Sequence, residues 1–216
     1  MGSRRWLFIV TPLIVLLFYG VSFAQESGFA KEFIKALDAN DEKRMTLLVE
    51  MKKATVPDEV KALIDASSAK EVTHDERMSM LYVAEVMAQH YKEVTGDFEP
   101  LKEVKKATFN AQIPGPVRST ATKGIHVVTM PMRSEKAKNY FKPANIIIKK
   151  GETVKWVNED SVAHIFSSMP FIGAGVFLSP MIDAGGDWQY TFDVPGEYFY
   201  ICFIHAGMLG KITVEE

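Results

Sequence analysis

The amino-acid sequence predicts an α+β protein of two parts, a helical bundle followed by an all-β sandwich. Between residues 27 and 107, apolar residues recur at intervals of three and four, which is the period of amphipathic helices. After residue 124, apolar and polar residues alternate, as they do in half-buried strands. The intervening residues 108–123 contain two prolines among small polar residues, a composition typical of a linker. We therefore expect a helical domain at 27–107 and a β domain at 124–216.

The first 24 residues are typical of an export signal. Arg4 and Arg5 precede a long apolar run, and small residues close the run at Ala24. This is the order of a secretory signal peptide cleaved after Ala24. The run approaches the roughly 17 to 25 residues that span a bilayer, so an uncleaved membrane tether through residues 6–24 is the alternative. Both interpretations predict a periplasmic or other extracytoplasmic protein.

The helical domain is expected to hold about four or five helices. The longest is marked by Thr73 and Glu76, whose spacing forms a capping box, and by Gly96, which ends it. The other helices are expected at residues 29–37, 41–53, 57–66 and 99–107. Met78, Met80 and Met87 are interpreted as flexible core filler rather than as a second, copper(I)-collecting site with His74.

The β domain is marked by short alternating stretches separated by turns. Strands are expected early in the domain around His126, then at 153–160, around 189–194, at 197–202 and at 210–215. The turn signals are Lys150-Gly151, Gly185-Gly186 and Pro195-Gly196. Short strands at such spacing predict a β-sandwich or a small barrel.

Charge and cysteine count limit the possible functions. The formal net charge of −2 offers no basic excess for neutralising phosphates, so no nucleic-acid partner is expected. The single cysteine, Cys202, cannot form an internal disulfide. In an exported protein it is therefore an inert buried thiol, an intermolecular partner, or a reactive or metal-bound sulfur.

The neighbours of Cys202 favour the metal-bound interpretation. His205 and Met208 follow it at intervals of three, so one loop between two strands can present a thiolate, an imidazole and a thioether to one point. A thioether suits copper far better than zinc. His164 is the best candidate for a second imidazole, because it follows a strand of the same domain. Two histidines and a cysteine with a weak axial methionine are the ligands of a blue-copper electron-transfer site.

The remaining histidines are less suited to this role. His126 has no other ligand type beside it in the sequence, and we interpret it as a strand residue. His74 and His90 belong to the helical domain.

At these motifs the sequence resembles the cupredoxins, especially the plastocyanin, pseudoazurin and amicyanin group. The matching stretches are 156-WVNEDSVAH-164 and 195-PGEYFYICFIH-205, and the Cys-x2-His-x2-Met spacing is amicyanin-like. The resemblance covers roughly residues 125–216. It implies a Greek-key cupredoxin sandwich that holds one copper, cycling between Cu(I) and Cu(II). The implied ligands are His164, Cys202, His205 and Met208.

The resemblance also implies a surface through which electrons pass. Redox partner proteins would dock near an exposed edge of His205, on an apolar patch. The candidates for this patch are Phe203, Ile204, Ala206, Leu209 and the loop 169–180. Asn158 resembles the family asparagine that braces the loop of the first ligand.

Two positions depart from the pattern of many relatives. Ile165 replaces a small polar residue, which predicts the loss of one hydrogen bond between loops, and Ala206 replaces a proline. Both changes leave the ligands in place and bear on the reduction potential and on the stiffness of the loop.

Several enzymes are excluded by residue inventory. A binuclear mixed-valence copper centre needs two cysteines, a trinuclear cluster needs further histidine pairs, and covalent c-type haem needs Cys-x-x-Cys-His. We therefore predict a non-enzymatic electron carrier with one type 1 copper. The alternatives are a delivery module, in which copper is cargo, and a metal-free binding scaffold. The helical domain would dock a partner, oligomerise the protein or act as a spacer.

Overall fold

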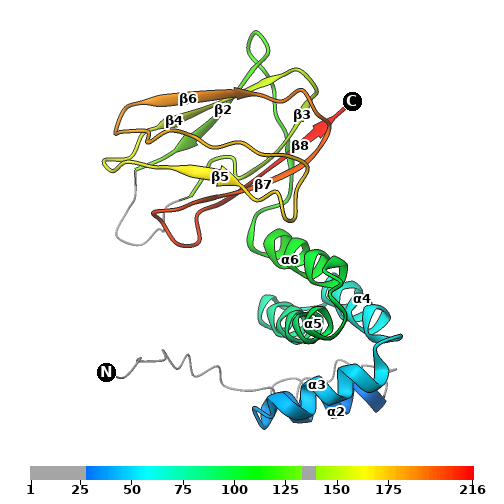
Figure 1. Ribbon diagram of the computed structural model, residues 1–216. Coiled ribbons are helices and arrows are strands. Elements are labelled where there is room, and N and C mark those ends of the chain that lie inside the picture. Colours follow the sequence, from blue (N-terminus) through cyan, green and yellow to red (C-terminus); the bar gives the residue numbers. More distant parts are fainter. Residues whose placement is uncertain (1–27, 133–139) are drawn as a thin grey trace. The chain divides into compact units, whose positions relative to one another are not determined.

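The structure is a computed structural model that describes residues 28–132 and 140–216 (Figure 1). It divides into two compact units. The helical unit holds the described residues up to Ala107, and the β unit is Thr108–Glu216. The export signal or membrane tether expected at residues 1–24 lies outside the described residues. Within the described part of the chain, no helix has both the length and the hydropathy needed to cross a membrane.

The helical unit contains the helices that the sequence predicts. The described part of the chain forms α2 (Gly28–Asp38), α3 (Glu42–Lys52), α4 (Val56–Ser67), α5 (His74–Thr95) and α6 (Glu99–Gln112). The capping box is present: the Glu76 amide donates to the Thr73 hydroxyl, and the Thr73 amide donates to the Glu76 carboxylate at 2.8 Å. Gly96 ends α5 in the left-handed conformation, with φ of 79°, which glycine adopts without a Cβ penalty.

One face of each of these helices packs into a common apolar core. Phe33, Val49 and Met87 are among its fully buried members. Met80 and Met87 are buried and Met78 is partly buried, which agrees with their interpretation as core filler. His90 is also buried, and its Nδ1 lies 3.1 Å from the Thr46 hydroxyl.

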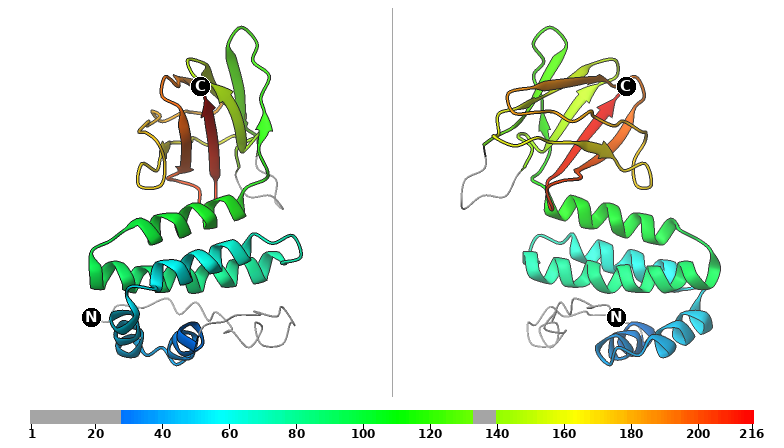
Figure 2. Two further views of the ribbon diagram at one scale, coloured as in Figure 1. Left: turned by 90° about the vertical axis from the view of Figure 1, so that its right-hand side faces the viewer. Right: turned by 60° about the vertical axis from the view of Figure 1, so that its left-hand side comes forward.

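The β unit is a sandwich of two sheets (Figure 2). One sheet has the strand order β1-β3-β8-β7-β5, and the other has the order β2-β4-β6. The strands are β1 (Val117–Arg118), β2 (Ile125–Met130), β3 (Asn145–Lys149), β4 (Thr153–Asn158), β5 (Phe166–Ser168), β6 (Asp187–Thr191), β7 (Gly196–Cys202) and β8 (Leu209–Glu215). From β2 to β7, successive strands change sheet at every step, so each connection crosses between the layers. β7 and β8 instead pair with each other as an antiparallel hairpin.

The segment expected to be a linker is more ordered than its composition predicts. Helix α6 continues to Gln112, and β1 pairs in parallel with β3. Tertiary contacts explain the difference. Phe109 packs edge-on against Phe199, and Arg118 makes a two-pronged ion pair with Glu215 at 2.8 and 3.0 Å. The prolines and small polar residues therefore indicate a connection between the two units, but this connection is ordered by its tertiary contacts.

Strand β6 also differs from its expected bounds. It ends at Thr191, before the apolar residues at 192 and 194 that extend the alternation. Phe192 is buried and exchanges main-chain hydrogen bonds with the turn at Gly151 and Glu152 rather than continuing the ladder.

The core of the sandwich is aromatic. Trp156 of β4 is fully buried, and its indole N–H lies 3.3 Å from the Tyr200 hydroxyl of β7, so the two sheets are joined by a hydrogen bond. Burial raises the pKa of Tyr200. The Tyr200 ring lies across Gly210 of β8, where a Cβ would overlap it. A glycine at the start of β8 thus allows the aromatic core to reach the end of the β7–β8 hairpin.

Candidate metal centre

The β7–β8 hairpin and the end of the loop before β5 position the predicted ligand residues. Cys202 is the last residue of β7, while His205 and Met208 lie in the turn that follows. His164 is held by a bridge to Ile182, with two main-chain hydrogen bonds of 3.0 and 2.8 Å. Cys202 and His164 are therefore anchored by regular main-chain pairing.

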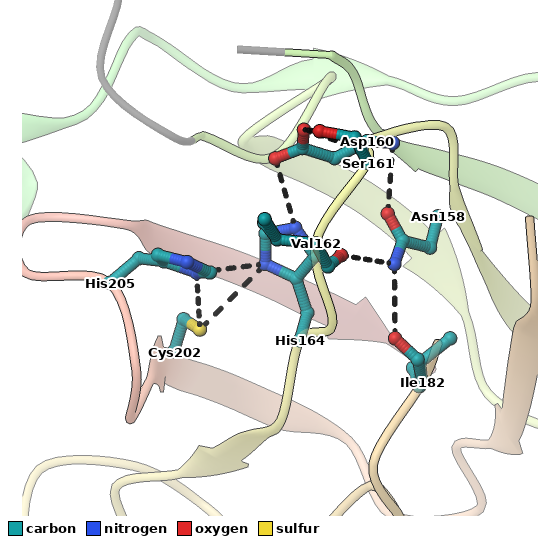
Figure 3. Close-up of polar contacts among 8 residues, drawn as sticks. All are labelled: Asn158, Asp160, Ser161, Val162, His164, Ile182, Cys202 and His205. Atoms are coloured by element: carbon teal, nitrogen blue, oxygen red, sulfur yellow. Dashed lines mark hydrogen bonds and ion pairs between the residues drawn. The ribbon is translucent and has the colours of Figure 1, made fainter. Parts of the chain in front are cut away.

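Three donor atoms converge at this place (Figure 3). His164 Nδ1 lies 3.1 Å from His205 Nδ1, and the Cys202 sulfur lies 3.5 Å from His205 Nδ1 and 3.9 Å from His164 Nδ1. Among the described residues, these three form the one group of histidine, cysteine and carboxylate side chains that could hold a metal ion. Cys202 and His164 are buried, whereas His205 is partly exposed.

The spacing of these atoms fits a bound metal. Nitrogen and sulfur atoms at about 2.0 and 2.3 Å from one ion lie roughly 3.2–3.9 Å apart when the angles between them are near 105–130°. The observed separations of 3.1, 3.5 and 3.9 Å are close to this range. A thiolate with two imidazoles is a set that soft and borderline metals prefer.

Met208 belongs to the same turn. Its side chain is buried, its amide donates to the His205 carbonyl at 3.2 Å, and its carbonyl accepts the Cys202 amide at 3.1 Å. These two bonds close the turn around His205. The loop that carries the cysteine is therefore held at both ends by its own main chain.

Asn158 braces the other loop, as its resemblance to the family asparagine predicts. Its side-chain amide donates to the carbonyls of Val162 and Ile182, at 2.8 and 3.0 Å, and its side-chain oxygen accepts the Asp160 amide at 2.9 Å (Figure 3). One buried side chain thus ties together both segments that approach His164.

The main chain provides a connection between the two loops. The Phe203 amide donates to the Ile165 carbonyl at 2.9 Å. Ile165 has no side-chain polar atom for the hydrogen bond that a small polar residue would make, but its carbonyl links the residue after His164 to the residue after Cys202.

Asp160 is a residue of this site that the sequence did not single out. Its carboxylate is buried, and Oδ2 lies 3.4 Å from His164 Nε2 (Figure 3). Burial lowers the pKa of His164 and the neighbouring His205 lowers it further, while Asp160 opposes both effects. The neutral imidazole, which can bind a metal, is therefore favoured. The available signal was a carboxylate four residues before a ligand histidine, the arrangement in which a carboxylate orients a metal-binding imidazole.

The other described histidines lie outside this cluster, as expected. His126 is a buried residue of β2, and its Nε2 lies 2.9 Å from the Glu152 carboxylate. His74 begins α5 at the surface, and His90 lies in the core of the helical unit.

Exposed apolar side chains surround His205 in the sequence. Phe203 is 61% exposed and Ile204 is 49% exposed. In the loop 169–180, Phe171, Val176 and Leu178 are exposed, while Ile172 and Phe177 are buried in the unit. The expected patch therefore uses only some of the apolar residues of that loop.

The sandwich and the cysteine–histidine cluster define a mononuclear metal-binding β protein. Residues 128–215 match the family described as copper binding proteins, plastocyanin/azurin family. Amicyanin-alpha from Methylorubrum extorquens is 36% identical over 81 residues, which are 37% of this chain and 67% of that protein. Plastocyanin from Scenedesmus fuscus is 33% identical over 97 residues, which are 41% of this chain and 99% of that protein. The chain belongs to the plastocyanin/azurin family, and copper is its cofactor.

Other known proteins are similar to a comparable share of the chain. Amicyanin from Paracoccus versutus is 37% identical over 35% of this chain, and the match spans only 58% of that protein. The solved structure of a purple cupredoxin from Nitrosopumilus maritimus aligns with 41% of this chain and 98% of its own, at 30% identity and a TM-score of 0.38. The family model, at residues 128–215, lies wholly within the β unit.

Proposed function

We propose that this protein is an electron carrier with one type 1 copper held by His164, Cys202, His205 and Met208. The observation that carries the proposal is the convergence of His164 Nδ1, Cys202 Sγ and His205 Nδ1 within 3.9 Å of one another. Copper bound there supplies a one-electron couple between Cu(I) and Cu(II). The names of the relatives, amicyanin and plastocyanin, support the same class of function.

Each side chain has a distinct part in this proposal. Cys202 provides the thiolate and connects the site directly to strand β7. His164 and His205 provide two neutral nitrogens, and Met208 provides the weak axial thioether. Because Asn158 and the main-chain bonds fix both loops, little rearrangement is needed when the oxidation state changes.

The surface beside His205 is the proposed site of electron exchange. His205 is partly exposed and the adjacent Phe203 and Ile204 are largely exposed, so a partner could approach the cluster through an apolar contact. Export fits this role, and residues 1–24 have the pattern of a secretory signal or of a membrane tether. We propose a periplasmic or other extracytoplasmic location on this basis.

The test is a copper(II) titration of residues 25–216, monitored by visible absorption and electron paramagnetic resonance. We expect an intense thiolate-to-copper band, small hyperfine splitting and one copper per chain, all lost in Cys202→Ser. His74→Gln is the control, because His74 is exposed in the helical unit and should leave the spectrum unchanged. An ordinary copper spectrum that survives in Cys202→Ser would overturn the proposal.

A second measurement separates a carrier from a delivery module. The copper-loaded protein is cycled between oxidised and reduced states in the presence of a copper chelator. Retention of the metal over many cycles is expected of a carrier. Rapid loss of copper to the chelator would instead favour delivery of the metal as cargo.

A further inference from the structure

We propose that Asp160 is a positioning residue whose carboxylate holds the Nε2–H group of His164. By holding this imidazole, Asp160 stabilises the oxidised form of the copper site. This inference rests on the proposed ligand role of His164. It concerns Nε2, the ring nitrogen of His164 that does not face Cys202 and His205. The ligand assignment gives this nitrogen no role.

The contact is specific in its geometry. Asp160 Oδ2 lies 3.4 Å from His164 Nε2, and both side chains are at least 98% buried. Within the described residues, no group makes a hydrogen bond to His164 Nε2. The separation is longer than the usual ~2.7–3.2 Å of an N–H···O bond, so we expect it to shorten once Nδ1 is fixed by a metal.

The carboxylate is itself held in place. Oδ1 of Asp160 accepts the Ser161 amide at 2.7 Å, and the Asp160 amide donates to Asn158 at 2.9 Å. Asn158 also holds Ile182, the residue whose main chain pairs with His164. The imidazole and the carboxylate that faces it are therefore positioned by one connected set of bonds.

This arrangement has two chemical consequences. A proton retained on Nε2 leaves the Nδ1 lone pair of His164 directed at Cys202 and His205, and the carboxylate makes that nitrogen a stronger donor. The negative charge also lies in a buried place, where it interacts more strongly with the extra positive charge of the oxidised site. Both effects favour Cu(II) over Cu(I), so Asp160 is expected to lower the reduction potential.

The test compares Asp160→Asn with the wild-type chain. The substitution keeps the shape of the side chain and an oxygen for the Ser161 amide, but removes the charge. We expect Cu(II) affinity to fall about 10- to 100-fold, the usual effect of losing such a partner of a ligand histidine. If the substitution weakens Cu(II) affinity more than Cu(I) affinity, the reduction potential should rise. The rise is about 59 mV for each factor of ten between the two losses of affinity.

Two further variants serve as controls. Asp183→Asn removes the same charge from an exposed residue next to Ile182, and should change the affinity and the potential little. Asp160→Glu retains the charge and should restore part of both properties. A purely structural role of Asp160 would lower the stability of the fold without this dependence on charge.

The tautomer of His164 provides a test that needs no variant. Nitrogen-15 NMR of the copper-free and Cu(I) forms should show the proton on Nε2. A proton on Nδ1 in the copper-free wild type would overturn the proposal, as would an unchanged Cu(II) affinity and potential in Asp160→Asn. If the wild type itself lacks the type 1 spectrum, the ligand assignment fails instead, and the NMR result still decides the contact with Asp160.

Discussion

The helical unit and the β unit differ in how many of their buried polar side-chain atoms have hydrogen-bond partners. In the helical unit the buried polar residues Ser67, Glu76 and His90 each have a hydrogen-bond partner in the unit. Among the described residues of this unit, Arg77 Nε is the one buried side-chain polar atom that lacks a hydrogen bond. In the β unit four buried side-chain atoms of the described residues lack hydrogen bonds: Thr108 Oγ1, His126 Nδ1, Asn145 Oδ1 and His164 Nε2. A buried carboxylate, that of Asp160, faces His164.

This difference helps to distinguish polar side chains that stabilise the fold from polar side chains that serve a function. A buried polar group without a partner costs free energy, so its presence calls for an explanation. At His164 the explanation that we propose is the metal site, where the arrangement would serve copper rather than the stability of the fold. The helical unit has an apolar core of aliphatic, phenylalanine and methionine side chains, and among its described residues only Arg77 Nε is buried without a hydrogen bond. We therefore expect it to stabilise itself without affecting the copper.

Among the substitutions that test this comparison, Phe33→Ala has the largest expected effect on stability. Phe33 is fully buried in the helical core, so its loss should cost about 3–5 kcal/mol of stability in that unit. Unfolding of the helices is followed by circular dichroism at 222 nm. The copper spectrum should be unchanged, and its loss would show that the two units depend on each other.

Tyr82→Ala is the control for this substitution. Tyr82 is also an aromatic residue of the helical unit, but it is 48% exposed. Its removal should therefore change the stability by no more than about 0.5 kcal/mol.

The next largest effect is expected for Gly210→Ala, in the β unit. The added Cβ would overlap the buried Tyr200 ring, and overpacking of this kind costs about 1–3 kcal/mol. In the fragment 25–216, which lacks Trp6, tryptophan fluorescence reports this unit selectively, because the remaining tryptophans are Trp156 and Trp188. The midpoint of unfolding should fall by this measure while the helical signal remains unchanged.

Gly115→Ala is the matched control in the same unit. A Cβ at Gly115 meets no atom within 4 Å, so the substitution should be nearly neutral. An equal loss of stability in both variants would mean that Tyr200 does not require the glycine.

A smaller effect is expected for Thr73→Ala, which removes the cap of α5. The Thr73 hydroxyl accepts a main-chain N–H, and loss of such a cap costs about 1 kcal/mol. Thr55→Ala is the control, because Thr55 precedes α4 without a capping hydrogen bond from its side chain. Circular dichroism should show a lower midpoint of unfolding for Thr73→Ala than for Thr55→Ala.

The smallest expected effect is a change in acid stability for Glu152→Gln. The Lys149 amide holds the pKa of Glu152 below its usual value, and His126 lowers it further, while burial opposes them. A lowered pKa in the folded state contributes stability above the unfolded value of about 4.3, and this contribution is lost as the pH falls through the folded value. Glu152→Gln should therefore lose less stability between pH 7 and pH 3 than the wild type, by tryptophan fluorescence.

Glu159→Gln is the control for the acid measurement. Glu159 is an exposed carboxylate of the same unit, and its removal should leave the acid dependence close to that of the wild type. If Glu152→Gln has the same acid dependence as the wild type, the hydrogen bonds to Glu152 do not contribute to stability above its unfolded pKa.

Much of this protein follows from local sequence. The helices, the capping box at Thr73 and the left-handed Gly96 could be predicted because their causes lie within a few neighbouring residues. The loop of Cys202, His205 and Met208 could be predicted for the same reason, since one turn carries all three donors. His164 needed the additional assumption that both segments belong to one sandwich.

The tertiary structure decided what depends on contact between distant segments. The order of residues 108–123 comes from Phe199 and Glu215, which pack and pair with it from far along the chain. The separations of the donor atoms, and the approach of the Asp160 carboxylate to His164 Nε2, likewise depend on how the loops fold back on each other. The sequence by itself determined which chemical groups this protein has and on which kinds of element they lie, because periodicity and turn chemistry act locally. Only the packed sheets determined how close those groups come, because a distance between remote residues is set by the whole core.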